Sequence, residues 1–249
     1  MKVVHDPARN ELLLGWLRRG NQCARAQDLV LRGSLMLGAV CPGARPPMDV
    51  DYLVPGLFNA QACEQLALEI AAQPDVSTHI SLERCVVIFG ETQFPGLRAF
   101  VRGESAVGPA SFQVDFGFGD PLSSPAVPVV IPRVGSVLAC TLETLFGWKL
   151  HGLVEFGRGR WHAKDLFDLW LIWTAAQLDI QATRAAVELA FSSRFLGLDA
   201  LDDFRTRPSW GESRSGQKKW RSFRNKHRGA PDFTVARSVV RQAVNIVLG

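Results

Sequence analysis

Apolar residues in the first part of the chain recur at helical spacing and then give way to short apolar runs. This pattern predicts a helix over residues 10–32 and a second helix that begins after Asn59 and ends before Pro74. Between them, residues 50–54 form a short, mostly apolar run closed by a Pro-Gly pair. Such a run predicts a buried strand.

The middle of the chain is rich in β-formers, and the last third returns to helical spacing. Strands are predicted at residues 80–89, 97–102, 112–118 and 127–131. After Pro132, helices are predicted at residues 141–156, 163–176 and 181–191. The expected fold is α+β: a mixed sheet with flanking helices over residues 1–135, followed by a helical domain with a basic C-terminal segment over residues 136–249.

Composition agrees with a folded chain of one or two domains. The chain has 249 residues, of which 47% are hydrophobic and 21% are charged. The apolar run at residues 12–17 is too short for a membrane span or a secretory signal, so we expect a cytoplasmic protein with no membrane partner. The five cysteines are scattered and contain no Cys-x-x-Cys pair, which favours reduced thiols over disulfides or a zinc site.

The net charge of +4 is unevenly distributed, because residues 213–231 contain no acid. Basic residues lie there beside Trp220 and Phe223, and together they could neutralise phosphates and stack on bases. The candidate nucleic-acid-binding residues are Lys218, Lys219, Arg221, Arg224 and Lys226. The alternative is a solvated helix that buries only its two aromatic residues.

Two acids one residue apart are the main chemical signal. Side chains alternate along a strand, so Asp49 and Asp51 point to the same face and can hold divalent cations together. Asp115, on a later apolar run, is placed to complete the site from a neighbouring strand. Structural alternatives are that Asp49 caps a loop, that Asp51 pairs with an arginine, and that Asp115 lies on an edge strand.

Gly33 and Ser34 precede the acids in a turn-like Arg-Gly-Ser sequence. Glycine lets backbone N–H groups approach an anionic triphosphate, and the serine hydroxyl can bind the same oxygens. The alternative is a glycine that ends a helix.

Two features of the helical part add candidate charges. Lys149 lies in the middle of a predicted helix, where it projects toward a phosphate or covers the core with its stem. Asp165 and Asp168 lie in the first turn of the next helix, where acids commonly stabilise the helix dipole. Either acid could serve the site.

These motifs occur together in the order of one known family. The segments are Arg32-Gly33-Ser34, Arg45 to Leu53 with Asp49 and Asp51, Gln113-Val114-Asp115, Leu142 to His151 with Lys149, and Lys164 to Leu169 with Asp165. In this combination the chain resembles the AbiEii/AbiGii-type nucleotidyltransferase toxins, a branch of the DNA polymerase β-like superfamily. The resemblance spans roughly residues 25 to 175 and extends to the Lys218–Phe223 element.

The resemblance implies a nucleotidyltransferase-like sheet and an enzyme that moves a nucleoside monophosphate from an NTP, with Mg²⁺, to a hydroxyl acceptor. By resemblance, Arg32, Gly33 and Ser34 bind the nucleotide. Asp49, Asp51 and Asp115 are the metal ligands, and Asp115 can draw the acceptor proton. Lys149 and Asp165 match the remaining catalytic positions, Lys149 also contacting the nucleotide.

The implied acceptor is RNA, specifically the 3′ end of tRNA, and the implied role is that of a toxin with an antitoxin partner. This chain departs from the family where Arg32-Gly33-Ser34 replaces Lys-Gly-Gly and where Pro47 replaces a Ser or Thr. The alternatives are transfer to a protein or small molecule, and a non-catalytic RNA- or partner-binding module.

Overall fold

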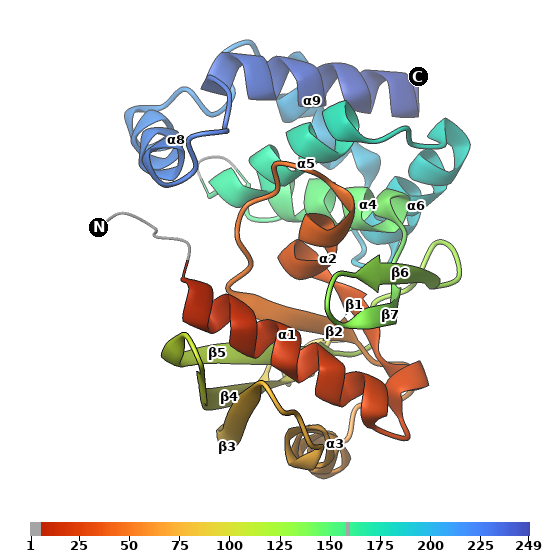
Figure 1. Cartoon of the computed structure of the whole chain (residues 1–249). Helices are drawn as coiled ribbons and strands as arrows, with labels where there is room; N and C mark the ends of the chain where they lie inside the picture. The colour runs from red at the N-terminus through yellow and green to blue at the C-terminus, as the bar shows by residue number, and fades with distance from the viewer. Residues whose placement is uncertain (1–5, 158–159) are drawn as a thin grey trace.

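The computed structural model describes residues 6–157 and 160–249, and a seven-stranded mixed sheet forms its lower half (Figure 1). The strands lie in the order β3-β4-β5-β2-β1-β7-β6. Their bounds are Val30–Arg32 (β1), Asp49–Leu53 (β2), Thr78–Ile88 (β3), Gly96–Ser105 (β4), Gly108–Gly117 (β5), Val127–Ile131 (β6) and Gly135–Ala139 (β7).

Strand β2 lies in the interior of this sheet. It pairs with β1 in antiparallel and with β5 in parallel orientation, while β3, β4 and β5 form consecutive antiparallel pairs. Strand β1 also pairs with β7 in parallel. Segments far apart in the sequence therefore lie side by side around β2.

One face of the sheet is apolar and is covered by α1 (Pro7–Gln22) and α3 (Ala60–Ala72) (Figure 1). On β5 the alternate residues Phe112, Val114 and Phe116 are buried, and Trp16 of α1 contacts Phe112 with ring centroids 6.1 Å apart. The residues between them project from the opposite face. That face is free to carry polar side chains.

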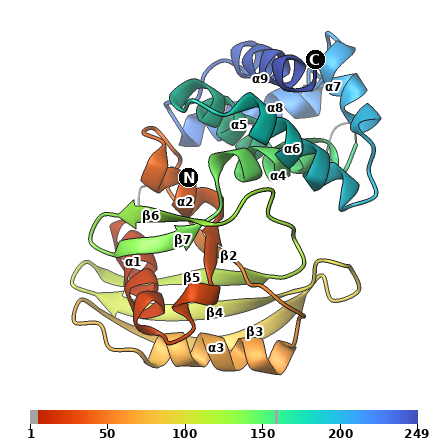
Figure 2. The same cartoon turned by 90° about the vertical axis from the view of Figure 1, so that its right-hand side faces the viewer.

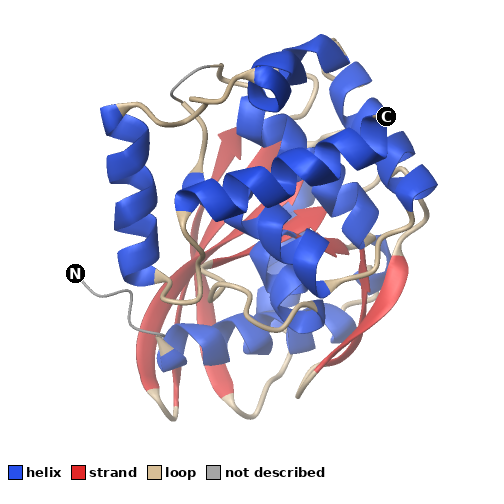
Figure 3. Cartoon of the chain, turned by 90° about the horizontal axis from the view of Figure 1, so that it is seen from above, coloured by secondary structure: helices blue, strands red, loops and turns tan. Residues whose placement is uncertain are grey.

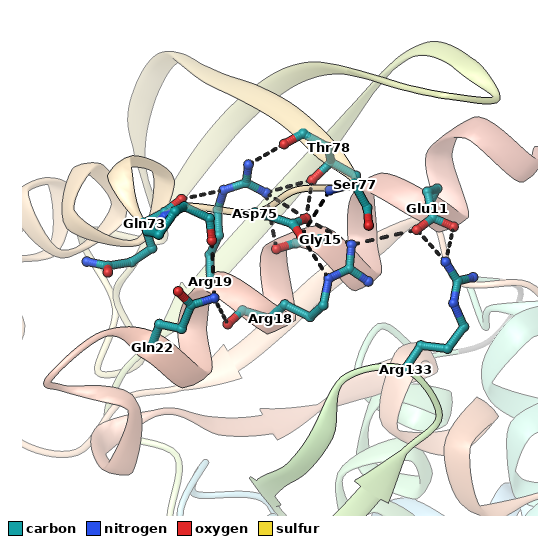
Figure 4. Close-up of polar contacts among 11 residues, drawn as sticks. Glu11, Gly15, Arg18, Arg19, Gln22, Gln73, Asp75, Ser77, Thr78 and Arg133 are labelled. Carbon is teal, nitrogen blue, oxygen red and sulfur yellow. Dashed lines mark hydrogen bonds and ion pairs between the residues drawn. The ribbon is translucent and has the colours of Figure 1, made fainter.

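Polar contacts fix α1 to the turn between α3 and β3 (Figure 4). Arg19 is 3% exposed and donates to the carbonyl oxygens of Gln73 and Thr78. Arg18 donates to both carboxylate oxygens of Asp75 at 3.1 and 2.8 Å. Burial opposes the charge of Asp75, but the hydrogen bonds from Arg18, Thr78 and a backbone amide lower its pKa to about 2.

Helices α4 to α9 stack above the other face of the sheet (Figures 2 and 3). Trp161 lies at the centre of an aromatic cluster in this part, with ring centroids 5.4 Å from Trp210, 5.5 Å from Phe233 and 6.4 Å from Trp220. The helices are α4 (Leu142–Val154), α5 (Ala163–Ala175), α6 (Ile180–Ser192), α7 (Asp202–Thr206), α8 (Arg214–Lys226) and α9 (Phe233–Leu248), and short 3-10 turns lie at Ala26–Asp28 and Leu198–Leu201.

The α+β fold expected from the sequence is confirmed, with differences in two places. The single helix expected over residues 10–32 is wrong: α1 ends at Gln22, and the chain continues through β1 into α2 (Gly33–Val40). The sheet also continues to Ala139, past the boundary expected at residue 135, because β7 pairs with both β6 and β1. The expected cap is present, since the Asn59 side chain accepts from the amide of Ala62.

All five cysteines are free, as expected. Within the described ranges, every helix is too short or too polar to span a lipid bilayer. Arg158 and Gly159, in the link between two predicted helices, lie outside the described residues.

Candidate active site

Four charged residues lie in one row across four neighbouring strands. Arg32 of β1 is opposite Asp51 of β2, and Asp51 is opposite Asp115 of β5. Asp115 is in turn opposite Arg98 of β4. Because residues opposite one another on paired strands project from the same face, two acids lie between two guanidinium groups.

This row forms the floor of a pocket of about 450 Å³ between the sheet and the C-terminal helices. Asp49, two residues before Asp51, projects into the same pocket. The structure therefore brings the three predicted acids together beside the predicted Gly-Ser turn. The lining residues are Arg32, Asp49, Asp51, Arg98 and Asp115 from the sheet, Gly33, Ser34, Arg45 and Met48 from α2 and the following loop, and Leu145, Trp148, Lys149, Lys164 and Asp165 from α4 and α5.

Gly33 begins α2 in the left-handed region, with φ of 74°. A Cβ at this position would collide with the Asp51 carboxylate, so only glycine lets the turn lie this close to the acids. The alternative of a helix-ending glycine is wrong, because the residue starts the helix.

The first turn of α2 carries no side-chain cap, so its N–H groups remain available to an anion. The Ser34 hydroxyl is 1% exposed and has no hydrogen-bond partner. Both features suit the binding of phosphate oxygens.

Asp51 lies where its negative charge is disfavoured. Burial and the neighbouring Asp49 raise its pKa to about 6; Asp115 adds to this rise, whereas Arg32 and Lys149 oppose it. Crowded carboxylate oxygens of this kind are the donors that Mg²⁺ and similar hard cations prefer, and a cation would relieve their mutual repulsion. Asp49 and Asp51 therefore fit a divalent metal ion.

Asp115 is held by Arg98 in a two-pronged contact, with Nε–Oδ1 at 2.7 Å and Nη2–Oδ2 at 2.6 Å. Among the described residues, no three His, Cys, Asp or Glu side chains are arranged as a set of metal ligands. In this structure Arg98 thus holds the third of the predicted acids. Strand β5 is an interior strand, so the alternative of an edge-strand acid is wrong.

Lys149 reaches the pocket from α4 between two acids of α5. Its Nζ lies 2.9 Å from Asp165 Oδ1 and 2.8 Å from Asp168 Oδ2. Burial disfavours the ammonium charge, but Asp168 and Asp165 outweigh burial and raise the pKa of Lys149. The ammonium group of this lysine is therefore a buried, fixed positive charge.

The two acids of α5 have different positions. Asp165 lines the pocket, and although burial opposes its charge, Lys149 and His162 lower its pKa. Asp168 is fully buried and also accepts from Arg45 at 3.2 and 3.3 Å. Asp165 is thus the acid that a ligand can reach. Asp168 does not line the pocket and instead forms ion pairs with Lys149 and Arg45.

Arg32 lines the pocket but forms its ion pair with Asp120. The same acid pairs with Arg194, which follows α6. The guanidinium of Arg32 also lies 5.4 Å from the ring centroid of Trp148. The alternative in which Asp51 pairs with an arginine is therefore not observed here: the arginine opposite Asp51 is paired with another acid.

The predicted basic segment forms α8, and its aromatic residues face inward. Trp220 is 2% exposed and stacks with Phe223, which packs on Phe167 of α5. Base stacking on Trp220 is therefore wrong as an expectation, whereas Phe223 is only half-buried; the amphipathic-helix alternative describes α8.

Two of the basic residues of α8 also have protein partners. Lys219 donates to the Trp161 carbonyl at 2.6 Å, and Arg224 pairs with Asp232. The exposed basic side chains of α8 are Arg214, Lys218, Arg221, Arg224 and Lys226, and Arg228 lies just after the helix.

Sequence reasoning missed Arg98, Trp148 and Lys164 as lining residues of the pocket. Lys164 directly precedes the predicted Asp165, so proximity to a candidate acid could have indicated it. Arg98 carries no such signal, because its place depends on how β4 pairs with β5.

Comparisons with known proteins identify the family of this chain. A family model described as "Nucleotidyl transferase AbiEii toxin, Type IV TA system" matches residues 17–239. No curated protein is similar to this chain in sequence.

Two solved structures share the fold. One is a crystal structure from H. pylori whose description proposes a nucleotidyltransferase, with 14% identity, a TM-score of 0.51, and coverage of 96% of this chain and 97% of that chain. The other is JHP933 from Helicobacter pylori, with 14% identity, a TM-score of 0.50, and coverage of 95% and 92%. At this identity the two structures support the fold alone. Since the family model covers most of the sequence, this chain belongs to the AbiEii nucleotidyltransferase toxin family.

Proposed function

We propose that this chain transfers a nucleoside monophosphate from an NTP to a hydroxyl group of RNA, with Mg²⁺ bound by Asp49 and Asp51. The observation that carries the proposal is the gathering of both acids in one pocket with the Gly33 turn and the fixed charge of Lys149. When bound, the divalent cation supplies charge neutralisation on the phosphates and alignment of attacking and leaving oxygens.

The chain's own residues supply the remaining roles. The first-turn amides of α2 and the unpartnered Ser34 hydroxyl donate hydrogen bonds to phosphate oxygens. Lys149, fixed by Asp165 and Asp168, places a positive charge beside them. Asp115, once free of Arg98, takes the proton of the attacking hydroxyl.

The RNA acceptor, with the 3′ end of tRNA as the expected substrate, is supported by the exposed charges of α8. These lie at the end of the molecule that carries α5 (Figure 1). His227, directly after α8, is close enough to the pocket cluster that Arg45 and Asp168 both act on its pKa, which burial lowers. A strand bound along α8 would approach Arg45 at the pocket.

The family description also supports a cellular role. The matching family model is named for a toxin of a type IV toxin–antitoxin system. We propose that this chain acts in the cytoplasm and that a cognate antitoxin counteracts it.

The experiment is a label-transfer assay with Mg²⁺, total RNA and each of the four NTPs in turn. The native chain is expected to label RNA, and Asp49→Asn is expected to lower the rate by at least about 10³-fold, because it removes a carboxylate ligand of the metal. Glu64→Gln, at an exposed position of α3, is the matched control and should retain full activity.

The remaining outcomes separate the alternatives. Transfer that survives Asp49→Asn would overturn the metal assignment. Label in protein or in a small molecule would replace RNA as acceptor. Mg²⁺-dependent stabilisation by NTP without transfer to any acceptor would indicate a non-catalytic binding module.

A further inference from the structure

Arg98 lies at the edge of the pocket and controls the third acid. Its guanidinium occupies both oxygens of Asp115, and Asp115 is the residue directly opposite Asp51 on the neighbouring strand. The contact therefore uses the oxygens that Asp115 would need in order to join Asp49 and Asp51 around a cation. Arg98 and a shared metal ion compete for the same side chain.

The surroundings of Arg98 allow it to leave. Its side chain is 35% exposed, compared with 16% for Asp115, and Asp115 is its only hydrogen-bond partner among the described residues. The hydrogen bond that Arg98 donates to Asp115 raises the pKa of Arg98, burial opposes this, and the charges of Asp115, Asp49 and Asp51 add to the rise, so the guanidinium keeps its charge. Another anion near the pocket would stabilise the charged guanidinium once it releases the carboxylate.

A nucleotide triphosphate provides that anion. The planar guanidinium binds carboxylate and phosphate with the same paired geometry, so the exchange replaces one two-pronged contact with another. Three of the other cations of the pocket are engaged by acids: Arg32 by Asp120, Arg45 by Asp168, and Lys149 by Asp165 and Asp168. Lys164, which is exposed, also lines the pocket.

We propose that Arg98 is a positioning residue that exchanges partners: it binds Asp115 in the free protein and a phosphate of the nucleotide in the loaded one. The exchange makes Asp115 available only when the nucleotide is present. This proposal rests on the proposed function, because it assumes that an NTP binds in this pocket. Its consequence is that the metal ion and the nucleotide bind cooperatively.

The first test measures Mn²⁺ binding calorimetrically without nucleotide, in the native chain, Arg98→Gln, Asp115→Asn and the double variant. Arg98→Gln is expected to bind Mn²⁺ about 10-fold more tightly than the native chain, because it frees the Asp115 carboxylate. In the Asp115→Asn background the same change should have little effect. Arg102→Gln, an exposed arginine on the same face of β4, controls for loss of charge alone.

The second test measures the binding of a non-hydrolysable NTP analogue by calorimetry, in the presence of Mg²⁺. Arg98→Gln is expected to weaken this binding about 10-fold, because a charge-assisted hydrogen-bond donor to phosphate is lost. Arg98→Lys keeps the charge without the paired contact, so it provides the same comparison should Arg98→Gln not fold. It should lie between the native chain and Arg98→Gln in both measurements.

Two results would overturn the proposal: Mn²⁺ affinity that Arg98→Gln leaves unchanged, or that it raises equally with and without Asp115. Unchanged affinity for the analogue would remove the phosphate as the second partner. Neither measurement contains an acceptor, so absence of label transfer by the native chain would defeat the proposed function separately.

Discussion

Gly33 is the residue on which the close approach of turn and acids depends. Its φ of 74° disfavours any side chain, and a Cβ would strike the Asp51 carboxylate. Both the backbone and the predicted metal ligand would have to move to accommodate even a methyl group.

We therefore expect Gly33→Ala to lower the free energy of unfolding by about 1–2 kcal/mol and the transfer rate by about 10²-fold, because Asp51 is displaced. Chemical denaturation and the label-transfer assay measure the two effects. Gly38→Ala in the same helix is the matched control. Nothing lies within 4 Å of its added Cβ, so the free energy of unfolding should rise by about 0.5–1 kcal/mol. Equal activity of the two variants would contradict the role of Gly33.

Helix α8 is the element whose two sides have separate roles. Its aromatic side packs into the cluster around Trp161, and its exposed side carries the unburied lysines and arginines. Because Trp220 is buried, the proposed contact of α8 with RNA rests on its exposed charges.

The double variant Arg221→Gln/Lys226→Gln removes two exposed charges of α8 and should weaken RNA binding. The slope of log affinity against log salt concentration should become shallower by the equivalent of about two phosphate contacts. The measurement is RNA affinity across a series of salt concentrations. Arg25→Gln/Arg84→Gln removes the same charge from the sheet end of the molecule and should leave the salt slope unchanged. If both pairs lower the slope alike, α8 has no specific part in RNA binding.

At the scale of the whole molecule, Asp168 joins the two halves of the pocket. It is fully buried and binds Lys149 of α4 as well as Arg45 of the loop before β2. The sheet and the helical part therefore share one buried cluster of charges, and loss of Asp168 removes the acid paired with Arg45 and leaves Lys149 with Asp165 alone.

We expect Asp168→Asn to lower the free energy of unfolding by about 3–5 kcal/mol, because it removes the acid of a buried ion pair and leaves the cation in place. Thermal and chemical unfolding measure this loss. Asp232→Asn removes an acid from the exposed ion pair with Arg224 and should cost at most about 1 kcal/mol. An Asp168→Asn variant no less stable than Asp232→Asn would mean that the cluster does not hold the halves together.

Much of the fold follows from local pattern. The strands at β3, β4, β5 and β6 carry their own apolar residues and turns, and the cap at Asn59 is encoded by one side chain and the sequence after it. Strand β1 was missed because three residues are too few to show a period of two next to a helical pattern. Strand β7 was missed because its neighbours, not its own sequence, make it a strand.

The sequence by itself determined that Asp49 and Asp51 share a face, since alternation along one strand is a local property. It also determined that a glycine turn precedes them. Only the tertiary structure decided that Arg98 holds Asp115, that Asp168 clamps Lys149 and Arg45, and that Trp220 is buried. Each of these depends on which distant segments lie side by side, and strand order and helix packing set those neighbours through the whole core.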